Sequence, residues 1–290
     1  MLMRKVIQNT AERIVTDAGI VTLPVCPLVI AQNANILVEA KPIFADGVSG
    51  MFLKVGENFG ILYSTYIRSI GFQNFSIGHE LGHYYLEGHA DAVLRMGPHS
   101  SKAGFVSNDR YEREADLLAA SLLMPEDIFK REMGAAGFGL KAIERLAEVA
   151  KTSLTSTAFR FQELSRDAVA VALSCGAQVD VCFYSDRFKD FKPPYMQKGT
   201  PVPEGCLTAD FNRIEAKVLG AAADEGETRF TDWFGVDGPR LREEVKGLGS
   251  YGKTLTILTC DAKSEDDYDP LEEADDDEYL RERWTPRFHR

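Results

Sequence analysis

The residues best suited to chemistry lie in the stretch 75–83, which contains the motif His-Glu-x-x-His. In a helix, His79 and His83 lie one turn apart on the same face, where both imidazoles can bind one Zn²⁺ ion. Glu80 lies about 100° around the helix from His79, too far to bind the same ion comfortably. It can still face a water molecule beside the metal. The spacing therefore predicts one zinc site per chain, with Glu80 as the general base.

Such a site predicts the hydrolysis of peptide bonds. Glu80 would take a proton from a water molecule whose pKa the zinc lowers to about 7, and the water would then attack a peptide carbonyl. Glu80 would hand the proton on to the leaving amine. Mn²⁺ or Fe²⁺ can occupy similar histidine and carboxylate ligands, so the sequence leaves the physiological metal open.

A catalytic zinc ion needs a third protein ligand, for which the sequence offers two candidates. His89 lies six residues after His83, as in metzincins, but Leu86 occupies the position where that pattern has a turning glycine. Glu112 begins the next predicted helix and is followed one turn later by Asp116. This pair could place Glu112 on the metal and Asp116 behind a ligand histidine, so we favour Glu112 over His89.

Two glycines, Gly78 and Gly82, lie four residues apart inside the same predicted helix. Each costs about 0.5 to 1 kcal/mol relative to alanine, which predicts that a neighbouring helix, plausibly the one with Glu112, packs closely there. A polar side chain should also stabilise the oxyanion. The candidates near in sequence, among which the sequence does not choose, are Tyr84, Tyr85, His89, His99 and Tyr111.

The elements that position these residues follow from apolar spacing and from glycine and proline. A helix is expected at 4–17, followed by short strands at 36–39, 50–55 and 60–66. The motif helix should begin at Asn74 as its N-cap and end near residue 86. A second helix should occupy 111–123 and stop before Pro125, with a loop between the two helices.

Two further amphipathic helices are predicted at 140–150 and 154–165, around a turn at Lys151, as in a helix-turn-helix. Their charges nearly balance, whereas DNA binding requires a one-sided basic face, so we expect a supporting role and no DNA binding. Beyond them, β-branched and apolar runs predict a second α/β domain. Its expected strands are 169–173, 179–184 and 254–260, and its expected helices are 212–223 and 239–248.

The formal charge of −11 is concentrated at the end of the chain. The segment 261–283 alone carries −9, which leaves about −2 elsewhere and gives no electrostatic attraction toward nucleic acid or anionic membranes. We expect this tail to be disordered. Five scattered cysteines predict reduced core thiols, and no apolar run is long enough to cross a membrane, which together predict a cytoplasmic protein.

The stretch 75–83, followed by Tyr111-Glu-Arg-Glu-Ala-Asp-Leu-Leu-Ala-Ala-Ser-Leu-Leu-Met-Pro125, resembles the ImmA/IrrE family of metallopeptidases. The resemblance implies a gluzincin-type site completed by Glu112, and an α+β fold. It also implies a peptidase domain at 1–134, a helix-turn-helix-like segment at 135–167 and a GAF-like sensor or docking domain at 168–262. An acidic tail would follow at 263–290.

The same resemblance implies that the substrate is a helix-turn-helix transcriptional repressor, whose cleavage releases a stress or mobile-element response. A small molecule could then act on the C-terminal domain. Two alternatives remain open: a regulatory or antitoxin-like binding protein that retains the site, and a DNA-binding sensor. The intact Glu80 argues against the first, because a site used only for binding needs no general base.

Overall fold

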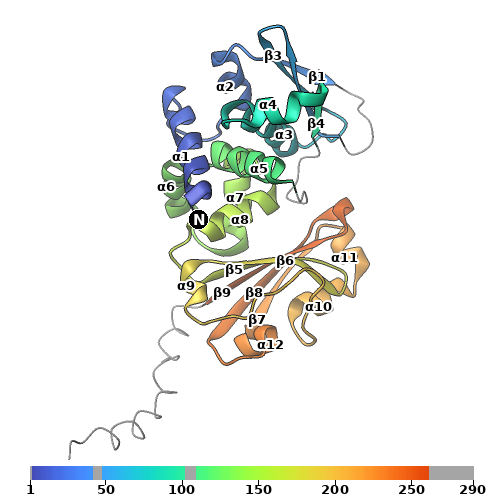
Figure 1. Ribbon diagram of the computed structural model, residues 1–290. Helices are drawn as coiled ribbons and strands as arrows, with labels where there is room; N and C mark the ends of the chain where they lie inside the picture. The colour runs from blue at the N-terminus through green and yellow to red at the C-terminus, as the bar shows by residue number, and fades with distance from the viewer. Residues whose placement is uncertain (1, 42–47, 102–108, 261–290) are drawn as a thin grey trace, which may run out of the picture. The chain divides into compact units, whose positions relative to one another are not determined.

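The computed structural model describes residues 2–41, 48–101 and 109–260. The chain divides into two compact units, Met1–Leu164 and Ser165–Arg290 (Figure 1). Each unit has its own β-sheet and its own helices, which confirms the predicted α+β class. The acidic segment 263–290 lies outside the described residues, and the four-part domain division stays a prediction.

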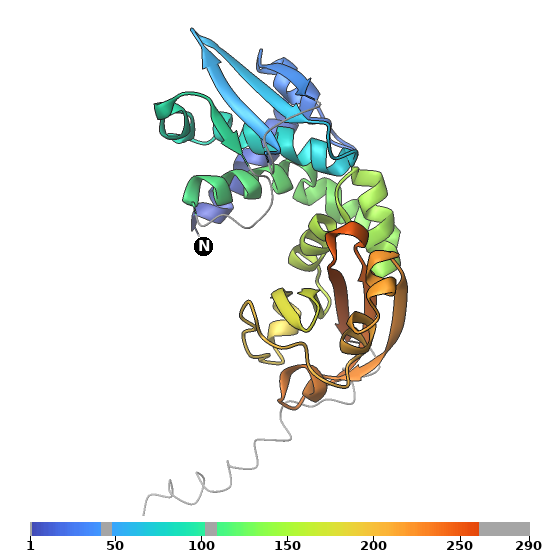
Figure 2. The same ribbon diagram turned by 90° about the vertical axis from the view of Figure 1, so that its right-hand side faces the viewer.

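The first unit combines a four-stranded sheet of order β1-β3-β2-β4 with helices. β1 runs parallel to β3, while β2 is antiparallel to both β3 and β4. Figure 2 shows the β2–β3 hairpin (light blue) extending from this unit. Its elements are α1 Leu2–Asp17, α2 Pro27–Asn33, β1 Leu37–Lys41, β2 Gly50–Val55, β3 Asn58–Ser64, α3 Ile70–Tyr85, α4 His89–Val93, η1 Leu94–Met96, β4 His99–Ser101, α5 Arg110–Leu123, α6 Glu126–Ala136, α7 Gly139–Ala150 and α8 Leu154–Leu164.

The two helices that carry the predicted chemistry, α3 and α5, pack against each other through small residues. A Cβ atom added at Gly78 would lie 3.3 Å from the Cβ of Ala119, and one added at Gly82 would lie 2.8 Å from the Cα of Ala115. The close approach predicted from these glycines is therefore confirmed. Because no side chain separates the helices here, α5 is held at a fixed distance from the motif.

The start of α3 differs from the prediction. The Ser69 hydroxyl caps the helix by accepting a hydrogen bond from Phe72 N at 3.3 Å, so Asn74 is not the N-cap. Asn74 lies in the first turns of α3 and donates instead to the carbonyl of Lys151 at 3.2 Å. The loop expected between α3 and α5 was also wrong, because it contains α4 and β4.

The helical pair α7 and α8 supports the first unit through its turn. At Gly71, near the start of α3, an added Cβ would lie 2.6 Å from the carbonyl carbon of Thr152. In α8, the buried Arg160 donates to the carbonyl of Met124 at 3.0 Å and to Glu163 at 2.8 Å. These contacts use the turn between the two helices and residues of α8 for packing.

The second unit is a five-stranded antiparallel sheet of order β6-β5-β9-β8-β7. An aromatic cluster that includes Phe188, Phe230 and Trp233 forms much of its core. The elements are β5 Val169–Cys175, β6 Gln178–Tyr184, α9 Asp186–Lys189, α10 Leu207–Asn212, α11 Glu215–Leu219, β7 Ala223–Arg229, α12 Phe230–Phe234, β8 Arg240–Gly247, η2 Gly249–Tyr251 and β9 Thr254–Cys260.

Two helix predictions in the second unit were wrong. The segment 239–248 contains strand β8, which pairs with both β7 and β9, so pairing within the sheet overrides the local helical preference. The segment 212–223 holds only the short helix α11, and the chain then enters β7. Ala221, with φ of 51°, lies in the left-handed region that interrupts a regular helix.

All five cysteines are free, but only Cys182, Cys206 and Cys260 are buried. The prediction of core thiols therefore fails for Cys26 and Cys175, which are exposed. Within the described ranges, no helix combines the length and the apolar character needed to cross a membrane.

Candidate metal centre

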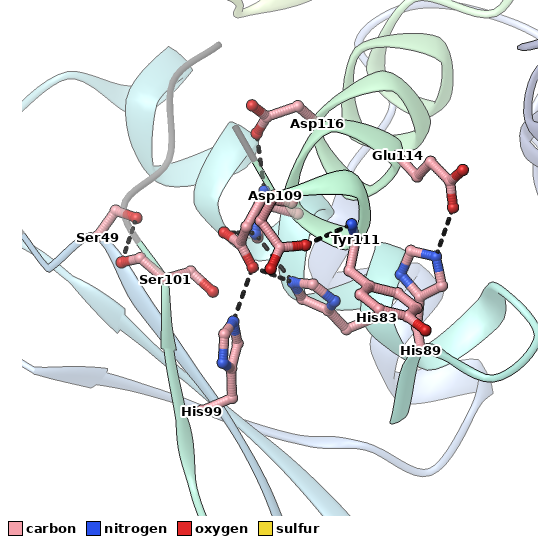
Figure 3. Close-up of polar contacts among 11 residues, drawn as sticks. Ser49, His83, His89, His99, Ser101, Asp109, Tyr111, Glu114 and Asp116 are labelled. Carbon is pink, nitrogen blue, oxygen red and sulfur yellow. Dashed lines mark hydrogen bonds and ion pairs between the residues drawn. The ribbon is translucent and has the colours of Figure 1, made fainter. Parts of the chain in front are cut away.

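The histidines of the motif face one another on α3. Their Nε2 atoms lie 3.1 Å apart, and both side chains are buried. Glu112 in the first turn of α5 completes a group in which one ligand atom each from His79, His83 and Glu112 lies within 4.8 Å of the others. Figure 3 shows His83 directed toward this group.

Glu112 is positioned by the start of α5. Asp109 caps the helix by accepting a hydrogen bond from Tyr111 N at 2.7 Å, which fixes the first turn. The Glu112 carboxylate then lies 3.3 Å from His79 Nε2 and 3.3 Å from His83 Nε2. Burial alone would raise the pKa of Glu112, but the surrounding imidazoles hold it well below its usual range. The group therefore contains a permanent negative charge.

Asp116 lies one turn further along α5 and faces the other side of His79. Its Oδ1 lies 2.8 Å from His79 Nδ1, which donates to the ionised carboxylate and leaves Nε2 directed at the group (Figure 3). Burial opposes charge on this ring, yet Asp116 and Glu112 raise the pKa of His79 to about 10. Burial lowers the pKa of His83 to about 4, so this ring is neutral at pH 7.

Glu80 is fully buried, and neither of its oxygens has a hydrogen-bond partner among the described residues. Burial raises its pKa to about 7, an effect that the positive charge of His79 and the nearby Ser101 hydroxyl partly oppose. Strand β2 leaves room for the carboxylate, because a Cβ atom added at Gly50 would clash with Glu80 Oε1. A buried carboxylate without partners is costly, which marks it as a group kept for chemistry.

His89 lies outside the three-residue group. Its Nε2 is 3.0 Å from Glu114 Oε2 (Figure 3). The other oxygen of Glu114 accepts from Arg110 at 2.7 Å. The same region contains two of the tyrosines considered for the oxyanion. Tyr111 packs on the ring of His89, and Tyr84 packs on Phe59.

His99 was considered only for the oxyanion, yet its Nε2 lies 2.8 Å from Glu112 Oε1. It belongs to β4, a strand of three residues whose existence depends on pairing with β2. No local pattern in the sequence signals such a strand. The contact between His99 and Glu112 was therefore missed, although His99 itself was named.

Two imidazoles and one carboxylate are the donor set of many catalytic zinc sites. The donors fit an ion here because His79 and His83 present Nε2 to each other at 3.1 Å, next to an anionic carboxylate. Only one of two imidazole nitrogens at this distance can carry a proton, and a metal ion could replace that proton between them. The group is thus a possible metal-binding site.

Residues 34–162 match the profile of the IrrE N-terminal-like domain. Among solved structures, the fold is similar to that of a Mycobacterium tuberculosis transcriptional regulator. The TM-score is 0.56 at 15% sequence identity, and the match covers 92% of this chain and 78% of that one. No curated protein matches the chain. The profile match shows an IrrE N-terminal-like domain at residues 34–162, which supports the resemblance to the ImmA/IrrE family.

Proposed function

We propose that this protein is a zinc-dependent endopeptidase of narrow specificity. His79, His83 and Glu112 would hold one Zn²⁺, which supplies a Lewis acid that polarises a peptide carbonyl and acidifies water. One observation carries the proposal: three ligand atoms lie within 4.8 Å of one another, next to Glu80, a buried carboxylate that has no hydrogen-bond partner in the described part of the chain.

The chain's own residues supply the remaining chemistry. Asp116 holds the His79 ring in the tautomer that directs its Nε2 lone pair at the ligand group. Burial brings the pKa of Glu80 to about 7, so this carboxylate can both take and return a proton near neutral pH. These two roles, orientation and proton transfer, are those of a gluzincin-type site with Glu112 as the third ligand.

We further propose that the substrate is a helix-turn-helix transcriptional repressor and that its cleavage triggers a stress or mobile-element response. The match to the IrrE N-terminal-like domain supports this proposal, and the likeness to a protein described as a transcriptional regulator suggests a regulatory setting. The segment 168–262 would act as a GAF-like domain that senses a small molecule or docks the substrate. The chain would work in the cytoplasm, without binding DNA.

The alternative is a regulatory or antitoxin-like protein that retains the site and acts only by binding. It predicts metal binding without turnover. Glu80 distinguishes the two, because a carboxylate buried without partners stabilises neither the fold nor a bound partner.

Elemental analysis of the purified protein after zinc loading tests the metal site. We expect one Zn²⁺ per chain, and less than about a tenth of an equivalent after removal of loose metal would overturn the proposal. Mn²⁺ and Fe²⁺ loading should be compared, since the ligands accept both. Incubation of the loaded protein with repressors encoded beside its gene then tests cleavage.

Competition with a chromophoric zinc chelator tests the ligand assignment. Glu112→Ala should lose zinc affinity by a large factor, and Asp116→Ala about 10-fold to 100-fold. His89→Ala should lose little, because its Nε2 already bonds Glu114. An unchanged affinity in Glu112→Ala, together with a large loss in His89→Ala, would reverse the assignment.

A further inference from the structure

His99 approaches the metal-binding group from the sheet, whereas the three proposed ligands come from helices α3 and α5. The pairing of β4 with β2 sets its place, because His99 lies opposite Phe52 in the register. Phe52 is buried, and its ring centroid lies 6.4 Å from that of His83. The edge strand thus presents His99 beside the ligands, as Figure 3 shows.

The hydrogen bond of His99 is the shortest that Glu112 makes to an imidazole. His99 Nε2 lies 2.8 Å from Glu112 Oε1, compared with 3.3 Å for the contacts with His79 and His83. The His99 ring also contacts the ring of His83, at 5.0 Å between centroids. About 24% of the His99 side chain is exposed, so this ring borders both the ligand group and solvent.

A bound metal ion would affect the three imidazole contacts of Glu112 differently, because His79 and His83 are proposed ligands and His99 is not. His79 and His83 would bind the ion through Nε2, and a nitrogen that binds a metal has no proton to donate. Their hydrogen bonds to Glu112 would therefore be lost. The bond from His99 does not use a ligand nitrogen, so it can persist while the other Glu112 oxygen faces the ion.

We infer that His99 is a positioning residue that holds the Glu112 carboxylate as the third metal ligand. It thereby links edge strand β4 to the metal site. The inference rests on the proposed zinc site and extends it from the helices to the sheet. Groups that orient metal ligands in this way contribute about 10-fold to 100-fold in metal affinity.

The test is a chelator competition that measures zinc affinity in the full-length chain and in variants whose folding is checked by circular dichroism. His99→Ala should weaken zinc binding about 10-fold to 100-fold. His99→Gln should restore part of the loss, because its amide can still donate to Glu112. His89→Ala is the matched control: its ring also lies near His83, at 5.6 Å, but bonds Glu114, so zinc affinity should change little.

A double variant separates positioning from direct ligation. If His99 acts through Glu112, His99→Ala should cost little extra affinity in a Glu112→Ala background. An equal loss in both backgrounds would overturn the inference, since His99 would then act independently of Glu112. So would an unchanged affinity in His99→Ala. Failure of the parent protein to bind zinc would instead overturn the proposed function.

Discussion

Each compact unit buries one glutamate completely, and the two are treated in opposite ways. In the second unit, Glu243 accepts hydrogen bonds from Leu207 N at 3.2 Å, Thr208 N at 2.7 Å and Thr208 Oγ1 at 2.6 Å. In the first unit, Glu80 has no hydrogen-bond partner among the described residues. Both carboxylates are inaccessible to solvent, so burial alone does not distinguish them.

The difference separates a structural carboxylate from one kept for chemistry. Glu243 ties the start of α10 to strand β8, and its bonds compensate the cost of burial. For Glu80 the nearby His79 offsets only part of this cost, and the pKa of Glu80 rises to about 7 as a result. The first unit thus carries a destabilising group at a fixed position, which is typical of an active site.

Glu80→Gln should give the largest effect, a loss of cleavage of about 10²-fold to 10⁴-fold. The substitution keeps the shape of the side chain, so zinc content should stay at one equivalent. Stability should be unchanged or slightly higher, because a buried charge without partners is removed. Single-turnover cleavage of the loaded protein measures the rate, and activity within threefold of the parent would show that another group activates the water.

Gly50→Ala should reduce cleavage by about 10²-fold, because the added Cβ would displace the Glu80 carboxylate from its place. Zinc affinity should stay near that of the parent, since the three atoms nearest to that Cβ all belong to Glu80 and not to a proposed ligand. The matched control is Gly60→Ala on the neighbouring strand β3, where the added Cβ meets the flexible end of Leu53 at 3.0 Å. Equal activities of the two variants would contradict the proposed role of Gly50.

Glu243→Gln should affect stability instead of the metal site. Zinc affinity should be unchanged, and the second unit should lose about 2 to 3 kcal/mol of stability. The amide that replaces one carboxylate oxygen cannot accept from the donors at the start of α10. Trp233 fluorescence during urea unfolding reports on this unit, provided that the only other tryptophan is removed by Trp284→Phe. An unchanged unfolding midpoint would show that the bonds of Glu243 contribute little.

Sequence spacing was sufficient to predict the parts of the site that lie within single helices. The His-Glu-x-x-His spacing and the pair Glu112 and Asp116 predicted which side chains share a helix face, and the glycines of α3 predicted the helix that packs there. The structure brings His79, His83 and Glu112 together. Each of these inferences needs only the helical repeat and the size of a side chain.

The remaining features depend on contacts between segments far apart in the sequence. His99 reaches Glu112 because β4 pairs with β2, about fifty residues earlier in the chain. Gly50 meets Glu80 because strand β2 packs against helix α3, and no local pattern connects the two residues. A helix was predicted at 239–248, but the segment lies between β7 and β9 and forms strand β8.

A third carboxylate, Glu163 on α8, completes the comparison, because it is half-buried and paired with positive charge. It accepts from Arg160 at 2.8 Å and from Gln8 at 2.8 Å, and it also pairs with Arg4. Burial alone would raise the pKa of Glu163, but the two guanidinium groups hold it below its ordinary value. Its charge therefore contributes stability that is complete above the unfolded-state pKa and is lost as the pH falls through the lower, folded-state pKa.

Glu163→Gln should accordingly cost the first unit about 1 to 2 kcal/mol at pH 7, the smallest effect of the four. The gap between variant and parent should narrow as the pH falls below about 4.5, the ordinary value for a glutamate. Urea unfolding followed by far-ultraviolet circular dichroism measures this difference in stability at pH 7 and in acid. The control is Glu148→Gln at an exposed position on α7, which should change the stability very little at both pH values. A gap that stays constant or widens in acid would mean that Glu163 stabilises α8 as a hydrogen-bond acceptor and not through its charge. Glu163 would then no longer be an intermediate case between the other two glutamates. Glu243 accepts hydrogen bonds from neutral donors, whereas Glu80 has no hydrogen-bond partner among the described residues.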